Sequence, residues 1–208
     1  MSSRFPDSAI TPGFEADPVV HSHAGRGPHG SLASRALDRA LTEIIGCTEA
    51  ASPGPVQDIP DLSRTLEARC GQRAARGIAL RVGSACFTHV VRRIGDQAGL
   101  TQPAFRLLPL SLRLRQGLLA FRGLLTEFSG RGARVEEQDG RLFWRLPDCP
   151  ICAGLRASEP ICFLMLGMLE QALSWLSGGK VFDVQEIACR ARGDEDCIFL
   201  IEPSPVEL

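Results

Sequence analysis

Tyrosine is absent from this sequence, and only 6% of its residues are aromatic. The chain also lacks any apolar run near the roughly 18 residues that a membrane-spanning helix requires, so no such helix is predicted. Its first 20 residues show no charged-then-apolar segment followed by a cleavage site. We therefore expect a cytoplasmic protein.

An excess of charge of either sign is missing too. The 208 residues carry 23 Lys and Arg against 24 Asp and Glu, which gives a net charge of −1. A chain without a basic field is not expected to bind nucleic acid or another polyanion. In the reducing cytoplasm, the eight cysteines are better explained as metal ligands, core residues or redox groups than as disulfides.

Histidine is too scarce for hydrolytic catalysis, because three of the four histidines precede residue 31 and no Ser, His and Asp set can be assembled. His89 is a possible axial ligand of a tetrapyrrole, but a hydrogen-bonded structural histidine is the simpler interpretation. The stretch Gly25-Arg26-Gly27-Pro28-His29-Gly30 spells a dinucleotide-binding pattern. It lacks the strand–helix–strand context that such a loop needs, so no nicotinamide or flavin site is predicted.

The remaining patterns predict an α+β fold, with a helical N-terminal half packed on an antiparallel sheet of hairpins and a buried helix between the hairpins. The Pro-, Gly- and Ser-rich residues 1–30 are predicted to be a disordered arm, and residues 31–208 a single domain. Predicted helices cover a segment capped by Ser31 or Ser34 and ended by Gly46, then residues 61–75, 78–95, 107–128 and 160–176; predicted hairpins cover 135–146, with the turn Asp139-Gly140, and 181–201.

Cysteines crowd the last quarter of the chain. Cys149 and Cys152 form a chelating C-x-x-C turn after a predicted strand, and Cys162 falls in the first turn of the buried helix, where the helix dipole favours thiolate. Cys189 and Cys197 lie on the two arms of the last hairpin. Such a concentration of thiols is typical of a zinc site.

Glu186 can complete such a site, but it is three residues from Cys189, and the two side chains would face opposite sides of a regular strand. A bulge or an early strand end is therefore required if both bind one ion. The alternative is that Cys162, Cys189 and Cys197 are buried apolar residues and that the C-x-x-C turn is a redox pair. Cys47, Cys70 and Cys86 lack ligand spacing and are predicted to be core residues.

The run Cys149-Pro-x-Cys152, Cys162-x4-Gly167, then Glu186-x2-Cys189-x3-Gly193-Asp194-x2-Cys197-x-Phe199-x-Ile201 resembles the 4-vinyl-reductase-type (V4R) domain. The resemblance extends over about residues 75–203 and is most specific over 135–203. It implies the ligand-binding fold shared with nitric-oxide sensors and vesicle-tethering subunits, with an apolar pocket between helices and sheet.

The same resemblance implies a structural zinc, because the zinc ligands of phenol-sensing regulators match Cys162, Glu186, Cys189 and Cys197. Cys149 and Cys152 are additional donors that leave the ligand set open. One branch of the family is named for reduction of a vinyl group in the synthesis of bacteriochlorophyll, a pigment of photosynthesis, and the chain is similar to that branch in size.

We therefore expect a binding module with structural zinc that holds a small hydrophobic or aromatic ligand, as a carrier or accessory protein for a bacteriochlorophyll precursor. The alternatives are a reductase of a tetrapyrrole vinyl group with an external electron donor, and a scaffold that forms a homodimer through its helices. The expected pocket walls are Val82, Cys86, Phe87, Val90, Leu114, Leu118, Phe121 and, from the sheet, Phe143 or Trp144.

Overall fold

The computed structural model describes residues 32–45, 59–96, 98–129 and 132–207. The arm predicted for residues 1–30 and Cys47 lie outside these described residues. Within them the chain forms α1 (Leu32–Ile45), α2 (Ile59–Ile94), α3 (Pro103–Arg106), α4 (Leu110–Ser129), β1 (Arg134–Gln138), β2 (Arg141–Leu146), α5 (Phe163–Ser177), β3 (Phe182–Ala188), the 3₁₀ helix η1 (Arg190–Arg192) and β4 (Cys197–Pro205).

The four strands form one antiparallel sheet in the order β1-β2-β4-β3, so the α+β prediction is confirmed. Strand β4 is the last strand in sequence, yet it pairs with both β2 and β3. Alternate residues of β2 point to opposite faces of the sheet, as the two-residue period requires. Leu142, Trp144 and Leu146 are buried beneath the sheet, whereas Phe143 lies half-buried on the other face.

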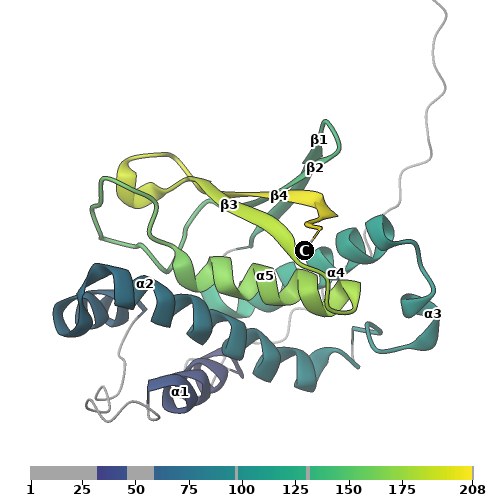
Figure 1. Ribbon diagram of the computed structural model, residues 1–208, viewed down its shortest axis with the longest axis horizontal. Helices are drawn as coiled ribbons and strands as arrows, with labels where there is room; N and C mark the ends of the chain where they lie inside the picture. Colours follow the sequence, from purple (N-terminus) through teal and green to yellow (C-terminus); the bar gives the residue numbers. More distant parts are fainter. Residues whose placement is uncertain (1–31, 46–58, 97, 130–131, 208) are drawn as a thin grey trace, which may run out of the picture.

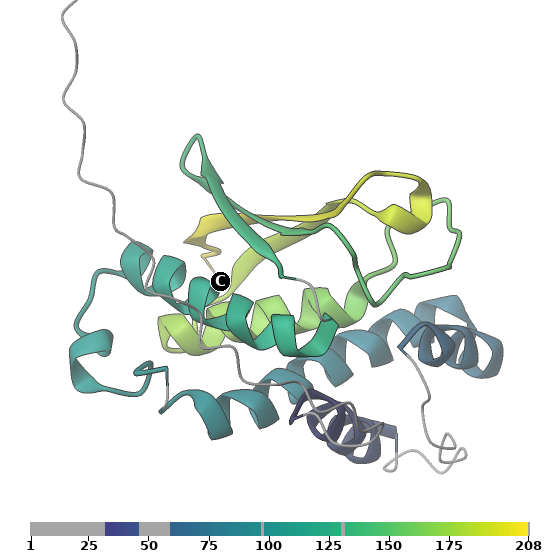
Figure 2. The same ribbon diagram turned by 180° about the vertical axis from the view of Figure 1, so that it is seen from behind.

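Helices α4 and α5 cover one face of this sheet, and α2 packs against α5 on the side away from the sheet (Figure 1). Helix α1 lies against α2 (Figure 2). Helix α5 is sandwiched between the sheet and α2, which explains why its sequence is apolar nearly all round. The buried side chains from α1 through β4 form one continuous hydrophobic cluster.

Two glycines allow α2 and α5 to approach each other at backbone contact distance. A Cβ atom on Gly83 would overlap the carbonyl oxygen of Leu164, and one on Gly167 would overlap the carbonyl oxygen of Leu80. The Ser84 hydroxyl donates a hydrogen bond to the Gly167 carbonyl across the same contact, at 3.2 Å. The crossing therefore holds the two helices closer than any side chain would permit.

Element boundaries differ from the predictions within α2 and at the start of α4. The break within α2 falls at Gly71, whose backbone is non-helical (φ 77°, ψ 160°), and not near Gly77, which is helical. Helix α4 begins at Leu110 instead of 107, because residues 103–106 form the separate α3. Leu107 is consequently 85% exposed, although the predicted apolar stripe began with it.

None of the described helices is long and apolar enough to cross a membrane. This agrees with the absence of a sufficiently long apolar run in the sequence.

The turn between β1 and β2 has the conformation expected from its Asp-Gly sequence, since Asp139 and Gly140 both have positive φ (52° and 76°). We expect Gly140→Ala to lower the free energy of unfolding by roughly 1 to 2 kcal/mol, because the left-handed conformation places Cβ against the backbone. Urea denaturation measures the change. Gly140→Asn is the matched control and should cost less, since Asn tolerates this conformation; equal costs would mean that the strain does not come from Cβ.

Candidate metal centre

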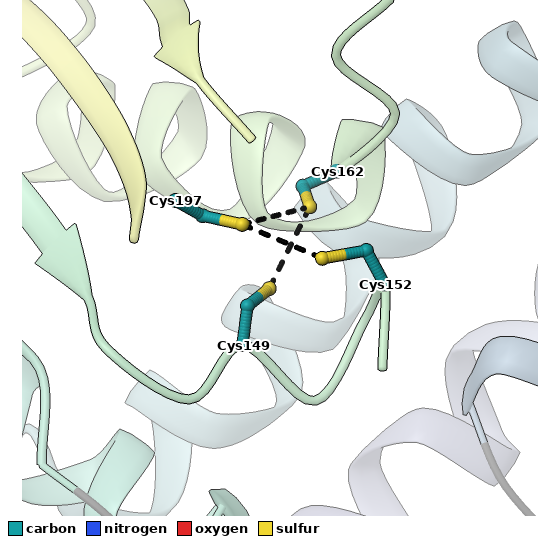
Figure 3. A group of neighbouring side chains, drawn as sticks. All are labelled: Cys149, Cys152, Cys162 and Cys197. Carbon is teal, nitrogen blue, oxygen red and sulfur yellow. Dashed lines mark hydrogen bonds between the residues drawn. The ribbon is translucent and has the colours of Figure 1, made fainter. Parts of the chain in front are cut away.

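Five buried cysteines from four chain segments meet at one end of the sheet. Cys149 and Cys152 come from the loop after β2, and Cys162 is the N-cap residue of α5. Cys189 follows β3, and Cys197 is the first residue of β4. Each side chain is at most 2% exposed, and Figure 3 shows the thiols of Cys149, Cys152, Cys162 and Cys197 pointing toward one another.

The distances between the sulfur atoms match those of a metal-binding tetrahedron. The Sγ atom of Cys162 lies 3.5 Å from that of Cys149 and 3.7 Å from that of Cys197, and the Sγ atoms of Cys152 and Cys197 are 3.4 Å apart. Four sulfurs bound to one Zn²⁺ at about 2.3 Å form a tetrahedron with edges of about 3.8 Å. Four buried cysteines thus lie close enough together to hold one metal ion.

Glu186 and Cys189 both reach this cluster because β3 ends before Cys189. The β3–β4 register is irregular between Glu186 and Ala188, and the strand stops at Ala188. The early end of β3 is the interruption that the three-residue spacing of Glu186 and Cys189 requires. Cys162, Glu186, Cys189 and Cys197 form a second group whose donor atoms all lie within 4.8 Å of one another.

Hydrogen bonds fix the loops that carry the thiols. The guanidinium of Arg190 donates through Nη1 to the Pro147 carbonyl at 2.6 Å and to the Asp148 carboxylate at 2.7 Å. This contact joins the segment before Cys149 to η1. The backbone N–H of Arg190 donates to the Cys197 sulfur at 3.3 Å, an interaction that favours a thiolate there.

The carboxylate of Asp194 holds the backbone on the other side of η1. It accepts a hydrogen bond from the Cys189 backbone N–H at 2.8 Å and another from the Arg192 guanidinium at 3.0 Å. The first of these bonds, together with the nearby Arg192 charge, lowers the pKa of Asp194. Asp194 therefore remains ionised and fixes the position of Cys189 at the end of β3.

One oxygen of Glu186 has no hydrogen-bond donor among the described residues. Oε2 accepts a hydrogen bond from the Cys162 backbone N–H at 2.8 Å, whereas Oε1 is buried without a partner. Burial raises the pKa of Glu186 to about 8, although the Cys162 N–H lowers it. A buried carboxylate oxygen that lacks a donor and lies beside thiols fits a metal ion as its missing partner.

The structure thus brings together all six donors named from the sequence: Cys149, Cys152, Cys162, Glu186, Cys189 and Cys197. The other cysteines are separate. Cys86 is buried in α2, as predicted, but Cys70 is exposed and donates a hydrogen bond to the Leu66 carbonyl at 2.9 Å, so its prediction as a core residue was wrong. His89 pairs with Glu43 at 2.9 Å, as expected of a structural histidine.

A small apolar cavity lies apart from the metal cluster, between α2, α4, α5 and the turn that follows α2. Its volume is about 20 Å³, room for about one water molecule. The rings of Phe87 and Phe121 meet edge to face at its wall, with centroids 5.3 Å apart. The lining residues are Phe87, Val91, Gly95, Ala98, Leu100, Gly117, Ala120, Phe121, Ala172, Trp175 and Leu176.

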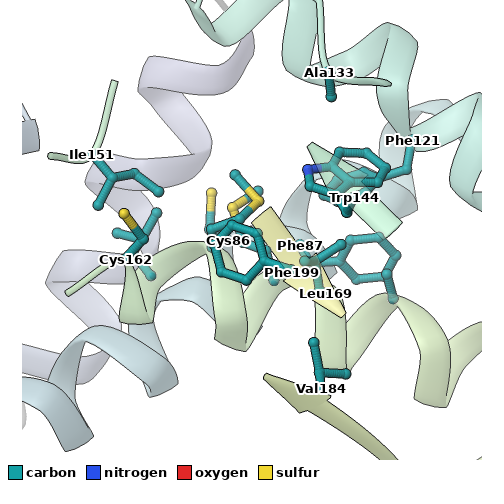
Figure 4. Packing of buried hydrophobic residues seen from close by; sticks show 14 of the residues in the cluster. Cys86, Phe87, Phe121, Ala133, Trp144, Ile151, Cys162, Leu169, Val184 and Phe199 are labelled. Carbon is teal, nitrogen blue, oxygen red and sulfur yellow. The ribbon is translucent and has the colours of Figure 1, made fainter. Parts of the chain in front are cut away.

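Of the pocket residues named from the sequence, Phe87 and Phe121 line this cavity. Trp144 stacks one ring farther in, 5.3 Å from Phe121, beneath the sheet (Figure 4). Phe143 is on the opposite face of β2 and does not reach the cavity. The remaining five, Val82, Cys86, Val90, Leu114 and Leu118, are buried in the core around it.

Two features of this region were not identified from the sequence. The indole N–H of Trp144 is buried and no described residue accepts its hydrogen bond. Arg106 covers the outer side of Trp175: its guanidinium lies 4.6 Å from the centre of the ring system and donates to the Trp175 carbonyl at 3.2 Å. Neither feature has a local sequence signal, because both depend on residues brought together by the fold.

Comparison with known proteins finds similarity over part of the chain. One match is an uncharacterized protein of Methanocaldococcus jannaschii, 36% identical over 61 residues, which cover 29% of this chain and 33% of the relative. Another is the family model of the V4R domain, which matches residues 142–203. That segment contains α5, β3, most of β2 and β4, and all six donors of the cluster. The similarity to the V4R domain is thus confined to residues 142–203 of this chain.

Proposed function

We propose that this protein is a zinc-stabilised binding module that holds a small hydrophobic or aromatic ligand between its helices and its sheet. The observation that carries the ligand assignment is the buried, unpaired indole N–H of Trp144. The V4R assignment supports a ligand-binding or vinyl-reductase-related domain at the coarser level.

Zinc is the proposed metal because thiolate-rich sets with tetrahedral spacing favour it. The five thiols lie on both sides of α5 and are almost fully buried, and Glu186 is half-buried beside them, so the sulfur atoms offer no open side to a substrate. A closed site of this kind is structural. Cys162 and Cys197 belong to both donor groups and are therefore the thiols that any bound ion uses.

The proposed ligand position lies beside Trp144. Burying an indole N–H without an acceptor costs roughly 1 to 3 kcal/mol, and an oxygen of a bound ligand removes that cost. Phe121, which packs against the Trp144 ring, lines the cavity, and Phe87 and Trp175 continue the aromatic wall, with ring centroids 6.5 Å apart. Aromatic walls with one polar group are typical of sites for small aromatic molecules.

A ligand must enlarge the cavity in order to enter. Gly117 of α4 faces the side chain of Leu176 so closely that a Cβ atom would overlap it, so the cavity ends where Leu176 fills the gap. Rotation of Leu176, or displacement of the Arg106–Trp175 pair, opens space without breaking the sheet. Leu176 is buried, whereas Arg106 is exposed, so displacement of the Arg106–Trp175 pair is the less costly of the two movements.

A bacteriochlorophyll precursor is the specific ligand we propose, on the strength of the resemblance to the vinyl-reductase branch. A tetrapyrrole ring is much larger than the observed cavity, so its uptake requires α4 and α5 to separate from the turn after α2. Binding of a single aromatic ring requires much less rearrangement. A titration series should therefore include both single-ring aromatic molecules and tetrapyrroles.

We expect Trp144→Phe to weaken binding of phenols roughly three- to tenfold, because the substitution keeps an aromatic ring and removes the hydrogen-bond donor. Calorimetric titration of the full chain with phenol and toluene measures the change. Toluene, which has no acceptor, is the matched control and should bind both proteins equally. An equal loss for both ligands would mean that Trp144 acts by packing alone.

Absence of saturable binding by phenols, fatty acids and porphyrins to the folded, zinc-loaded protein would exclude the ligand-binding function. Uptake without a change in the mass of a vinyl-bearing pigment supports a carrier. Conversion of the vinyl group in the presence of an added electron donor would instead assign the reductase function.

A further inference from the structure

The two donor groups overlap in a specific way. One consists of Cys149, Cys152, Cys162 and Cys197, and the other of Cys162, Glu186, Cys189 and Cys197. Each contains four donors, the number that a tetrahedral ion needs, and the two have two thiols in common. The six donors therefore form two groups of four that share the edge between the Cys162 and Cys197 sulfurs.

Sulfur distances on both sides of that edge agree with this arrangement. The shared edge measures 3.7 Å. On one side, Cys149 lies 3.5 Å from Cys162 and Cys152 lies 3.4 Å from Cys197. On the other side, Cys189 lies 3.9 Å from Cys162. All four distances are close to the edge of about 3.8 Å expected for zinc bound by thiolates.

One ion leaves two donors without a role. If it occupies the four-cysteine group, the Cys189 thiol and Glu186 Oε1 stay buried beside a centre that is already negatively charged. If it occupies the other group, Cys149 and Cys152 are left over. Either arrangement of a single ion therefore leaves two of the six clustered donors unused.

We propose that the cluster binds two divalent metal ions, bridged by the thiolates of Cys162 and Cys197. Cys149 and Cys152 complete the first coordination shell, and Cys189 and Glu186 complete the second. A thiolate sulfur has enough lone pairs to bind two ions at once. Two ions use every donor and supply the missing partner of Glu186 Oε1.

This inference rests on the proposed metal site and extends it, and metal analysis of the full chain distinguishes the two. We expect two equivalents of zinc per chain after purification without chelators. One equivalent would overturn the bridged centre and leave the structural zinc in place. Folded protein with no metal would overturn both.

Cobalt substitution tests the bridge directly. The first and second equivalents of Co²⁺ should both produce thiolate-to-metal absorption, and the electron paramagnetic resonance signal should fall as the second ion binds, because bridging sulfurs couple the two spins. Two uncoupled ions would contradict shared thiolates.

Substitutions test which residues bind the second ion. Glu186→Gln and Cys189→Ala should each reduce the metal content from two equivalents to one, whereas Cys70→Ser, which changes an exposed thiol outside the cluster, should retain two. Two equivalents in Glu186→Gln would remove that residue from the centre and overturn the proposed ligand set. Where a variant does not fold, the metal stoichiometry and the spin coupling of the unsubstituted chain still determine whether the cluster holds two bridged ions.

Discussion

Removal of metal from the cysteine cluster is expected to unfold the part of the chain that contains α5, β3 and β4. Metal binding to structural zinc sites contributes on the order of 10 kcal/mol, comparable with the about 5 to 15 kcal/mol that stabilises a whole domain. Without metal, buried thiols from four segments have only weak hydrogen bonds to one another. Cys197→Ser should act in the same way, because Cys197 belongs to both donor groups.

Near-ultraviolet circular dichroism during chelation measures this loss, since Trp144 is fully buried beneath the sheet and reports on its packing. Cys70→Ser is the matched control and should melt at the temperature of the unsubstituted protein, because Cys70 is exposed and outside the cluster. A chelated, metal-free chain with an unchanged cooperative transition would contradict a structural metal.

Gly167→Ala should destabilise the fold by about 3 kcal/mol or more, because the new methyl group would overlap the Leu80 carbonyl and force α2 and α5 apart. Gly83→Ala should have a similar effect through the Leu164 carbonyl. Backbone atoms cannot rotate away as a side chain can, so the helices must separate along their contact. Urea denaturation of the metal-loaded protein measures the loss.

Gly77→Ala provides the control within the same helix. Gly77 is exposed and helical, and a Cβ atom there would meet nothing within 4 Å. This substitution should stabilise α2 by up to about 1 kcal/mol, since alanine is the better helix former. Similar losses at positions 77 and 167 would show that helix propensity, and not the close crossing, determines the result.

Local chemistry made much of the fold predictable. The Asp139-Gly140 turn, the apolar sequence of α5 and the glycine that ends it, Gly178, each specify their structure within a few residues. The break in α2 was not predictable in this way, because Gly71 and Gly77 carry the same local signal and only packing distinguishes them.

The cluster was predictable in composition and not in arrangement. Spacing and family resemblance indicated the six donors, and the need for an interruption between Glu186 and Cys189 followed from strand geometry. Cys162 and Cys197 belong to both groups of donors. This depends on where α5 and β4 meet, which no local sequence pattern specifies. The unpaired N–H of Trp144 likewise appears only when the surrounding core is assembled.

The interior position of β4 has a consequence for the order of folding. During synthesis, β1 and β2 can pair early, but the inner edge of β2 stays open until residues 197–205 have been made. Leu142 and Trp144 on that strand are exposed to solvent and to neighbouring chains during this interval. Because Cys197 is the first residue of β4, insertion of the final strand also delivers the thiol on which both donor groups depend. With the metal centre proposed above, we expect metal capture and closure of the sheet to coincide, so that chains made without metal keep an open, aggregation-prone edge.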